Sequence, residues 1–310
     1  MDSYNQDGMY RRTFLSLASA VTALAKQQPP DDSEPIRFDV NRVNLLFTVS
    51  DKRGRFIKNL RKEDFEIVEG KRRQSIIEFA AETNLPLRIA LLVDTSNSIR
   101  DRFRFELEAS AQFLQSVIRQ GVDRAMIYSF DSESRIVQDF TDDTGLLAKK
   151  VRELRPGGGT AMYEAIYAAC RDRLRIDAGR ERLRRALIII GDGDDNASRY
   201  SRDQTLEMVQ KSDAVVYAIS TNTSRIESDG DKVLKYFASE TGGLAFFPFK
   251  AEDLSQDFEN IANELRSQYS VLYRPEPLVN DGLYHDVTVS VKAKKYLMIR
   301  ARKGYYAPKR

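Results

Sequence analysis

Asp94, Ser96 and Ser98 are the residues whose types and spacing point most directly to chemistry. They follow the apolar run from Ile89 to Val93, and a run of this kind bounded by polar residues is typical of a strand buried on both faces. Such a strand delivers one carboxylate and two hydroxyls to the carboxyl edge of a parallel sheet, where open α/β sheets bind ligands. Oxygen ligands without His or Cys suit a hard cation such as Mg²⁺.

Two further segments supply more oxygen atoms. Gly157-Gly158-Gly159-Thr160 precedes a helical pattern, and its glycines allow positive φ and close backbone approach, so the loop can present the Thr160 hydroxyl beside the first segment. The apolar run from Leu187 to Ile190 predicts a second buried strand, which is followed by Gly191 and Asp192. An acid at that strand end would complete the inner sphere of a cation or hold one of its waters.

The order of these parts resembles the metal-ion-dependent adhesion site (MIDAS) of von Willebrand factor type A (VWA) domains. That pattern is Asp-x-Ser-x-Ser, then a Gly-Thr loop, then a strand ending in Asp-Gly, and here it spans about Leu87 to Gln268. The resemblance implies a divalent cation held by five residues, Asp94, Ser96, Ser98, Thr160 and Asp192. In the family the two serines bind the ion directly, and the first aspartate commonly acts through water. We expect Mg²⁺, with Mn²⁺ and Ca²⁺ as alternatives.

The chemistry of this ligand set favours binding over catalysis. Hydroxyl ligands carry no charge, so the ion would keep much of its positive charge and accept an acid from outside. Mg²⁺ takes six oxygens and keeps several waters, so the last place would go to water or to a partner's carboxylate. We therefore expect a non-enzymatic adhesion or scaffold module whose partner is a protein that presents an Asp or Glu carboxylate.

Each part of the pattern also has a purely structural interpretation. Asp-x-Ser-x-Ser alone is commonly an N-cap and turn, and a triple glycine is often a flexible turn or an anion-binding loop. The stretch from Asp192 to Asn196 would serve as an ordinary acidic loop; it fails the EF-hand pattern because 191–201 offers neither the required Glu nor flanking helices. Because all three parts occur in order on suitable elements, we favour the interpretation as a metal site. We interpret Asp194 and Asp195 as charges at the rim of that site.

An enzyme of the phosphoryl-transfer class is the alternative function, with Asp94 as nucleophile and Mg²⁺ as cofactor. Haloacid-dehalogenase phosphatases have a similar strand-Asp segment, but they require a second acid two residues later, where this sequence has Ser96. The single His, His285, is far from the motifs in sequence, receives no role, and makes a Ser-His-Asp triad improbable. A degenerate site with a structural role is a third interpretation, which the five intact positions argue against.

The N-terminus is typical of an export signal. Arg11-Arg12-Thr13-Phe14-Leu15 opens a short apolar segment that reaches Ala25, and its spacing resembles the twin-arginine signal of bacteria. We predict a cleaved signal over 1–25, with an amphipathic helix or a membrane anchor as the alternatives. The segment is too short to span a bilayer, and no later stretch predicts a transmembrane helix. The mature chain is expected to be periplasmic or secreted.

Beyond the signal the sequence predicts three regions. Residues 26–36 form a Pro-containing linker, and 37–85 and 269–310 are β-rich, with about three strands each. A lone three-stranded sheet is marginal, so we predict that both ends form one small β-sandwich. Residues 86–268 alternate strand and helix, which predicts a VWA domain: a doubly wound, mainly parallel α/β sheet flanked by helices.

Composition adds few constraints. The 310 residues contain 49 Lys and Arg and 46 Asp and Glu, and the basic runs contain acids, so we expect no nucleic-acid partner. Cys170 lies in a helical pattern and is predicted to be a buried structural thiol.

A wider resemblance covers nearly the whole mature chain. Ser50 to Arg55, Leu60 to Phe65, the VWA segment and Gly304 to Pro308 resemble a group of exported VWA proteins described from acidobacteria. That group implies a fold and an export route rather than an activity.

Overall fold

The protein is described by a computed structural model. The described residues are 42–81, 85–97, 103–175, 183–224, 226–248, 250, 253–292 and 296–309. The predicted signal and linker lie outside these residues, as does Ser98. Among the described residues, no helix combines the length and the apolar character needed to cross a membrane.

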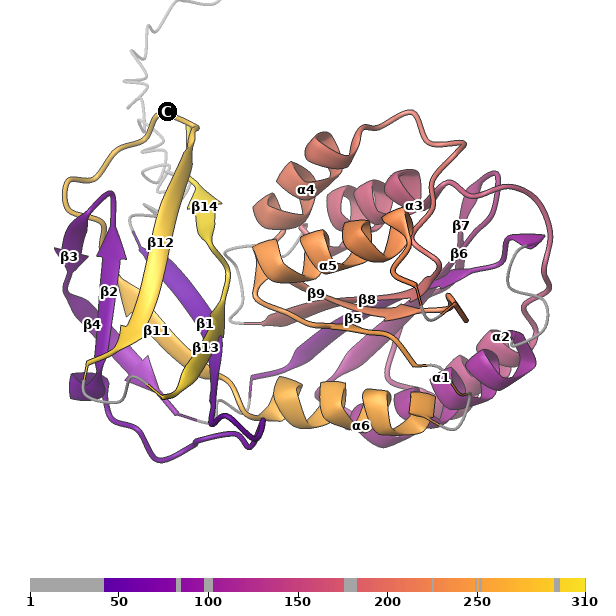
Figure 1. Cartoon of the computed structure of the whole chain (residues 1–310), viewed down its shortest axis with the longest axis horizontal. Helices are drawn as coiled ribbons and strands as arrows, with labels where there is room; N and C mark the ends of the chain where they lie inside the picture. Colours follow the sequence, from indigo (N-terminus) through magenta and orange to yellow (C-terminus); the bar gives the residue numbers. More distant parts are fainter. Residues whose placement is uncertain are drawn as a thin grey trace, which may run out of the picture. The chain divides into compact units, whose positions relative to one another are not determined.

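A mainly parallel sheet forms the centre of residues 86–268 (Figure 1). Its strands follow the order β10-β9-β8-β5-β6-β7, and only β7 runs antiparallel to its neighbour. Their bounds are β5 Leu87–Asp94, β6 Arg124–Phe130, β7 Ser134–Thr141, β8 Arg184–Gly191, β9 Ala214–Ser220 and β10 Ala245–Phe246. The two predicted acid-bearing strands, β5 and β8, are therefore neighbours in the middle of the sheet.

Helices cover both faces of this sheet (Figure 1). Side chains alternate along β5, so Ile89 and Leu91 join one core cluster whereas Ala90 and Leu92 join the other. The first cluster includes residues of α1 Phe103–Val117, α2 Thr144–Arg152 and α6 Asp253–Arg266. The second includes residues of α3 Met162–Ala169, its π-helical continuation Cys170–Leu174, α4 Arg202–Lys211 and α5 Asp229–Thr241. Because helices cover both faces of the sheet, its central strands have apolar side chains at consecutive positions. Cys170 is buried, as predicted.

The two ends of the chain meet in a pair of four-stranded antiparallel sheets, here called the terminal β-module (42–81 and 269–309). One sheet has the order β13-β1-β11-β4 and the other β14-β12-β2-β3. The bounds are β1 Val43–Ser50, β2 Phe65–Glu69, β3 Arg72–Gln74, β4 Ile76–Ala80, β11 Tyr269–Tyr273, β12 Tyr284–Val291, β13 Met298–Ala301 and β14 Gly304–Tyr306, with a short 3₁₀ helix at Lys62–Asp64. Leu45, Ile67 and Val287 belong to one core cluster that both sheets share. The predicted fold class is confirmed, with four strands from each end instead of about three.

The terminal β-module contacts the α/β region through buried polar groups. Glu264 on α6 is 1% exposed and accepts hydrogen bonds from Arg300 at 3.0 Å and Thr48 at 3.2 Å. Burial raises the pKa of Glu264, although the charge of Arg300 opposes the rise. Gly242, at φ +84°, ends α5 against the backbone of Ala301, where a side chain would overlap the neighbouring strand. For a buried ion pair such as Glu264 with Arg300, removal of one partner typically costs about 3–5 kcal/mol of unfolding free energy.

His285 occupies a polar network inside the terminal β-module. Its Nδ1 lies 3.0 Å from Glu69 Oε1, and its Nε2 lies 3.2 Å from Asp281 Oδ1. Glu69 also accepts hydrogen bonds from the hydroxyls of Tyr273 at 2.7 Å and Tyr305 at 3.0 Å. Burial disfavours the charged ring, but hydrogen bonds and charges from Glu69 and Asp281 outweigh it and raise the pKa of His285.

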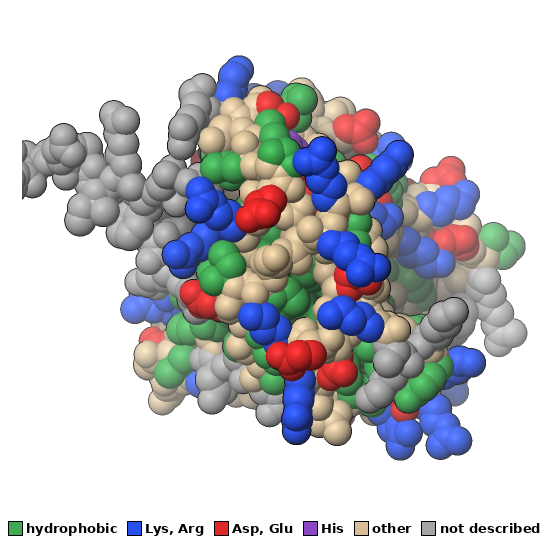
Figure 2. Space-filling model, turned by 90° about the vertical axis from the view of Figure 1, so that its left-hand side faces the viewer, with side chains coloured by type: hydrophobic (Ala, Val, Ile, Leu, Met, Phe, Trp, Pro, Cys, Tyr) green, Lys and Arg blue, Asp and Glu red, His purple; other side chains and the backbone are tan. Residues whose placement is uncertain are grey.

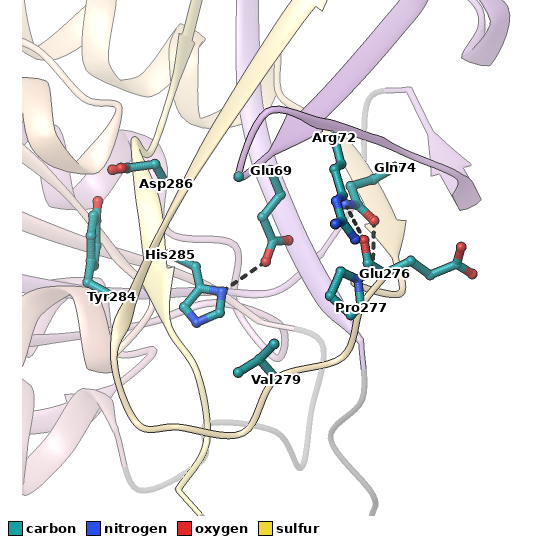
Figure 3. A pocket seen from close by; sticks show the side chains of 10 residues that line it. Glu69, Arg72, Gln74, Glu276, Pro277, Val279, Tyr284, His285 and Asp286 are labelled. Atoms are coloured by element: carbon teal, nitrogen blue, oxygen red, sulfur yellow. Dashed lines mark hydrogen bonds and ion pairs between the residues drawn. The ribbon is translucent and has the colours of Figure 1, made fainter.

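A pocket of about 460 Å³ lies against this network (Figure 3). His285 and Glu69 line this pocket together with Pro277 and Val279, which lie in the loop before β12. None of the four predicted cation ligands that the structure describes lines it, so the pocket is separate from the edge that holds Asp94.

The raised pKa of His285 predicts a pH-dependent stability. A protonated ring stabilises the fold fully below its ordinary pKa of 6.5, and this contribution is lost as pH rises through the higher folded-state pKa. His285→Gln should therefore cost about 1–2 kcal/mol of unfolding free energy below pH 6.5 and less in the alkaline range. Urea denaturation of both proteins below pH 6.5 and in the alkaline range measures this cost. A cost that does not change with pH would contradict the prediction.

Candidate functional site

Asp94 is the last residue of β5 and is fully buried. Its Oδ1 accepts a hydrogen bond from the backbone N–H of Ser96 at 2.7 Å. Its Oδ2 is buried and has no hydrogen-bond partner among the residues that the structure describes. Burial raises the pKa of Asp94 to about 7; the hydrogen bonds from Ser96 oppose the rise, whereas the charges of Asp192 and Asp131 add to it. The strand end thus carries a buried carboxylate that forms no ion pair with any residue in the described ranges.

Gly191 brings the second strand end against this carboxylate. The register of β5 and β8 pairs Val93 with Ile190, so Asp94 and Gly191 occupy the next positions on neighbouring strands. A Cβ at Gly191 would lie 3.0 Å from both Cβ and Oδ2 of Asp94. A side chain here would thus press on the Asp94 carboxylate, whereas glycine allows the close approach that brings the charge of Asp192 near Asp94. Asp192 Oδ1 accepts the backbone N–H of Asp194 at 3.1 Å.

The glycine loop is tied to both strand ends by backbone hydrogen bonds. Gly157 N–H donates to Thr95 O at 2.6 Å. On the other side, Thr160 N–H donates to Asn196 Oδ1 at 3.0 Å, and Thr160 O accepts from the N–H groups of Asn196 and Ala197. Thr160 is only 5% exposed. The loop after β8 and the loop after β5 are thus connected through 157–160.

Of the five predicted ligands, the structure places Ser96 in hydrogen-bonding contact with Asp94, and Asp192 close enough for its charge to raise the pKa of Asp94. It places Thr160 in the loop that bridges their two segments. Ser98 lies outside the described residues. Ligation of a cation by these residues stays a prediction.

Asp131 and its neighbour Ser132 also belong to this edge, and sequence reasoning missed them. Asp131 directly follows β6, whose last residue, Phe130, accepts the N–H of Thr95 at 2.8 Å. Ser132 Oγ accepts the N–H of Gly159 at 2.7 Å, and Arg135 pairs with the Asp131 carboxylate at 2.8 Å. The sequence signal that could have indicated them is the polar pair Asp131-Ser132 directly after the strand β6.

Asp194 and Asp195 differ from each other in role. Asp195 supports the start of α3, because its carboxylate accepts the N–H of Tyr163 at 2.7 Å and both the N–H and the hydroxyl of Ser198. Asp194 is exposed overall. Partial desolvation of its carboxylate, together with the nearby charge of Asp192, raises its pKa. Asp195 is thus a structural cap, and only Asp194 lies at the rim.

The donor set fits a hard divalent cation. The unpartnered Asp94 Oδ2 and the close pass of Gly191 leave a buried oxygen for which a positive ion would be the natural partner. Among the described residues, no cluster of three or more His, Cys, Asp or Glu could hold a metal. The predicted set has only two carboxylates and otherwise uses hydroxyls, which such a cluster does not include.

Gly193 allows a test of how this edge is packed. Its φ is +82°, and a Cβ there would overlap the carbonyl of Gly230 at the start of α5. Gly121 has a similar φ of +75° with open space around it, so it is the matched control. Gly121→Ala should cost about 1 kcal/mol of unfolding free energy, and Gly193→Ala roughly 2 kcal/mol more. Equal costs in chemical denaturation would show that the approach of Gly230 is unimportant.

Comparison with known proteins gives one family match. Residues 89–194 match the family described as von Willebrand factor type A domain. A comparison with curated protein sequences found no match.

Several solved structures resemble the chain at low identity. BatB from Bacteroides thetaiotaomicron, a conserved hypothetical protein, is 14% identical (TM-score 0.45; 58% of this chain, 100% of that one). The PilB minor pilin of Streptococcus sanguinis is 12% identical (TM-score 0.47; 60% and 63%). Proximal thread matrix protein 1 of the mussel byssus, with a zinc-occupied MIDAS motif, is 16% identical (TM-score 0.48; 64% and 49%). The chain thus spans less than two thirds of the pilin and about half of the mussel protein.

No conclusion about function follows from similarities at this level. The strand order, the loops gathered at the carboxyl edge and the family match over 89–194 agree with one another. The family match therefore identifies a von Willebrand factor type A domain within residues 89–194.

Proposed function

We propose that this protein is an exported, non-enzymatic binding module that engages a partner carboxylate through a divalent cation. The ion would be held by Asp94, Ser96, Ser98, Thr160 and Asp192. The observation that carries this proposal is the buried, unpartnered Oδ2 of Asp94 beside the charge of Asp192. An uncompensated buried carboxylate is costly, and a cation would remove that cost.

The chemistry of the ligands supports Mg²⁺, with Mn²⁺ and Ca²⁺ as alternatives, because all the donors are hard oxygens. Two carboxylates and three neutral hydroxyls would leave the ion attractive to one more anion. The partner would therefore be a protein that presents an Asp or Glu side chain.

Two observations disfavour the alternative of a phosphoryl-transfer hydrolase. Asp94 is fully buried with one oxygen held by Ser96, and Ser96 occupies the place of the second acid that such enzymes need. His285 is engaged with Glu69 and Asp281 in the terminal β-module. Export rests on the Arg11-Arg12 signal pattern and is part of the proposal.

Removing the Asp94 carboxylate should abolish cation binding without loss of the fold. In the wild type, Mg²⁺ at one hundred times its Kd should add about 2.7 kcal/mol to the unfolding free energy. Asp94→Ala should show no such gain and no heat in a calorimetric Mg²⁺ titration. An unchanged titration in a folded variant would refute the assignment.

A second pair of variants controls for indirect effects. Gly191→Ala places a methyl 3.0 Å from Asp94 Oδ2 and should weaken Mg²⁺ binding at least tenfold, whereas Gly157→Ala meets nothing within 4 Å and should bind normally.

A pull-down from a bacterial envelope fraction would test the partner. The chain starting at Lys26 should retain a protein with Mg²⁺, and should lose it with chelator or with Thr160→Ala. Thr144→Ala, at the start of α2 and away from the glycine loop, is the control and should retain it. A partner indifferent to chelator and to Thr160→Ala would place the binding surface elsewhere.

A further inference from the structure

Charge is divided unequally between the two parts of the chain. Residues 42–81 and 269–309 together contain 18 Lys and Arg but only 9 Asp and Glu. Residues 86–268 contain 26 and 30, respectively. The small net charge of +3 therefore conceals a strongly basic terminal β-module. Figure 2 looks at the side of the molecule that holds this module, and Lys and Arg side chains project over much of it.

Many of these cations gather where β1 ends and β13 begins. Ser50 pairs with Met298 of β13 and also bridges to Phe56, and Lys292 donates from its Nζ to the backbone of Glu63 at 3.0 Å. These contacts bring 51–64 close to Lys292 and to the start of β13 at Met298. We call the basic residues of this region the polybasic end: Lys52, Arg53, Arg55, Lys58, Arg61, Lys62 and Lys292.

The three acids of this region, Asp51, Glu63 and Asp64, neutralise only part of the charge of its seven cations. Asp51 accepts from the backbone and side chain of Arg55, and Asp64 accepts the N–H of Arg61 at 2.8 Å. The side chains of Lys52 and Lys62 are exposed and form no ion pair with any residue that the structure describes. A structural role for a surface cation usually involves such a partner, so these charges are available to another molecule.

Two large apolar side chains are exposed beside the cations. Tyr296 is 56% exposed, and Met298, the first residue of the edge strand β13, is 47% exposed. Cations with an adjacent aromatic and an apolar side chain suit the interface of a bilayer, where headgroups pair with Lys and Arg and the rings lie at headgroup level.

We propose that the polybasic end docks the protein on a bilayer surface that contains anionic phospholipid. Lys52, Arg53 and Lys62 would contact headgroup phosphates, while Tyr296 and Met298 would enter the headgroup layer. A flat lipid surface fits cations spread over a loop and a strand end better than a groove-bound polymer does. This proposal does not depend on the cation site.

Docking in this way leaves the Asp94 edge accessible. The terminal β-module contacts the amino ends of the parallel strands, since Arg302 pairs with Asp213 directly before β9. Asp94 lies at the carboxyl ends, and an eight-residue strand is about 26 Å long.

The test is co-sedimentation with vesicles of phosphatidylcholine alone and with added phosphatidylglycerol. The chain starting at Lys26 is used, so that the apolar segment before it does not insert. Binding should require phosphatidylglycerol and fall with rising salt. Each cation near an anionic surface contributes about fivefold to partitioning, so reversing Lys52, Arg53 and Lys62 to Glu should lower it at least about 100-fold.

Lys71→Glu, Arg72→Glu and Arg274→Glu together are the matched control, because they change the net charge equally elsewhere on the same module. An equal loss in the control would mean that binding follows net charge, which would overturn the polybasic end as the site. Tyr296→Ala should weaken vesicle binding severalfold without changing its salt dependence. Equal affinity for duplex DNA or inorganic polyphosphate would overturn the lipid surface as the partner.

Discussion

The approach of two carboxylates at the ends of neighbouring parallel strands is the constraint on which the candidate site depends. Asp94 and Asp192 come together where Gly191 lets β8 pass close to the Asp94 carboxylate, since a Cβ at Gly191 would lie 3.0 Å from Asp94 Oδ2. Burial of that carboxylate with one free oxygen is unfavourable unless a proton or a cation compensates it. Hydrogen bonds from backbone N–H groups connect the glycine loop to Thr95 and to Ser132 in the loop after β6, so contacts within the protein position this edge. Such preorganisation is what a precise ligand geometry requires.

The central strands and their acids were predictable because their signals are local. An unbroken apolar run indicates a strand covered on both faces, and β5 divides its side chains between two helical layers as expected. Asp131 was not predictable in the same way. It reaches the site because β6 neighbours β5, and this strand order cannot be read from the chain order. Asn196 depends likewise on a contact with the backbone of Thr160, 36 residues away.

The terminal β-module shows the same limit more strongly. Alternating apolar residues predicted strands at both ends and their association, since neither set could bury its face alone. The division into two sheets follows from registers that sequence does not reveal: β1 lies between β11 and β13, whereas β2 pairs with β12. His285 received no role because its partner Glu69 is 216 residues away. Polar networks of this kind depend on tertiary contacts and leave no periodic pattern.

The position of the terminal β-module relative to the strands suggests why one chain would combine two surfaces. Contacts such as Glu264 with Arg300 fix the module at the amino ends of the strands, and the Asp94 edge is at their carboxyl ends. Sites this far apart without shared residues usually act additively. Docking through the polybasic end and capture of a partner through a cation would then be independent steps whose free energies sum. A chain held at a lipid surface would meet a membrane-bound partner at a raised local concentration, which strengthens a weak single-carboxylate contact without any new contact at the cation site.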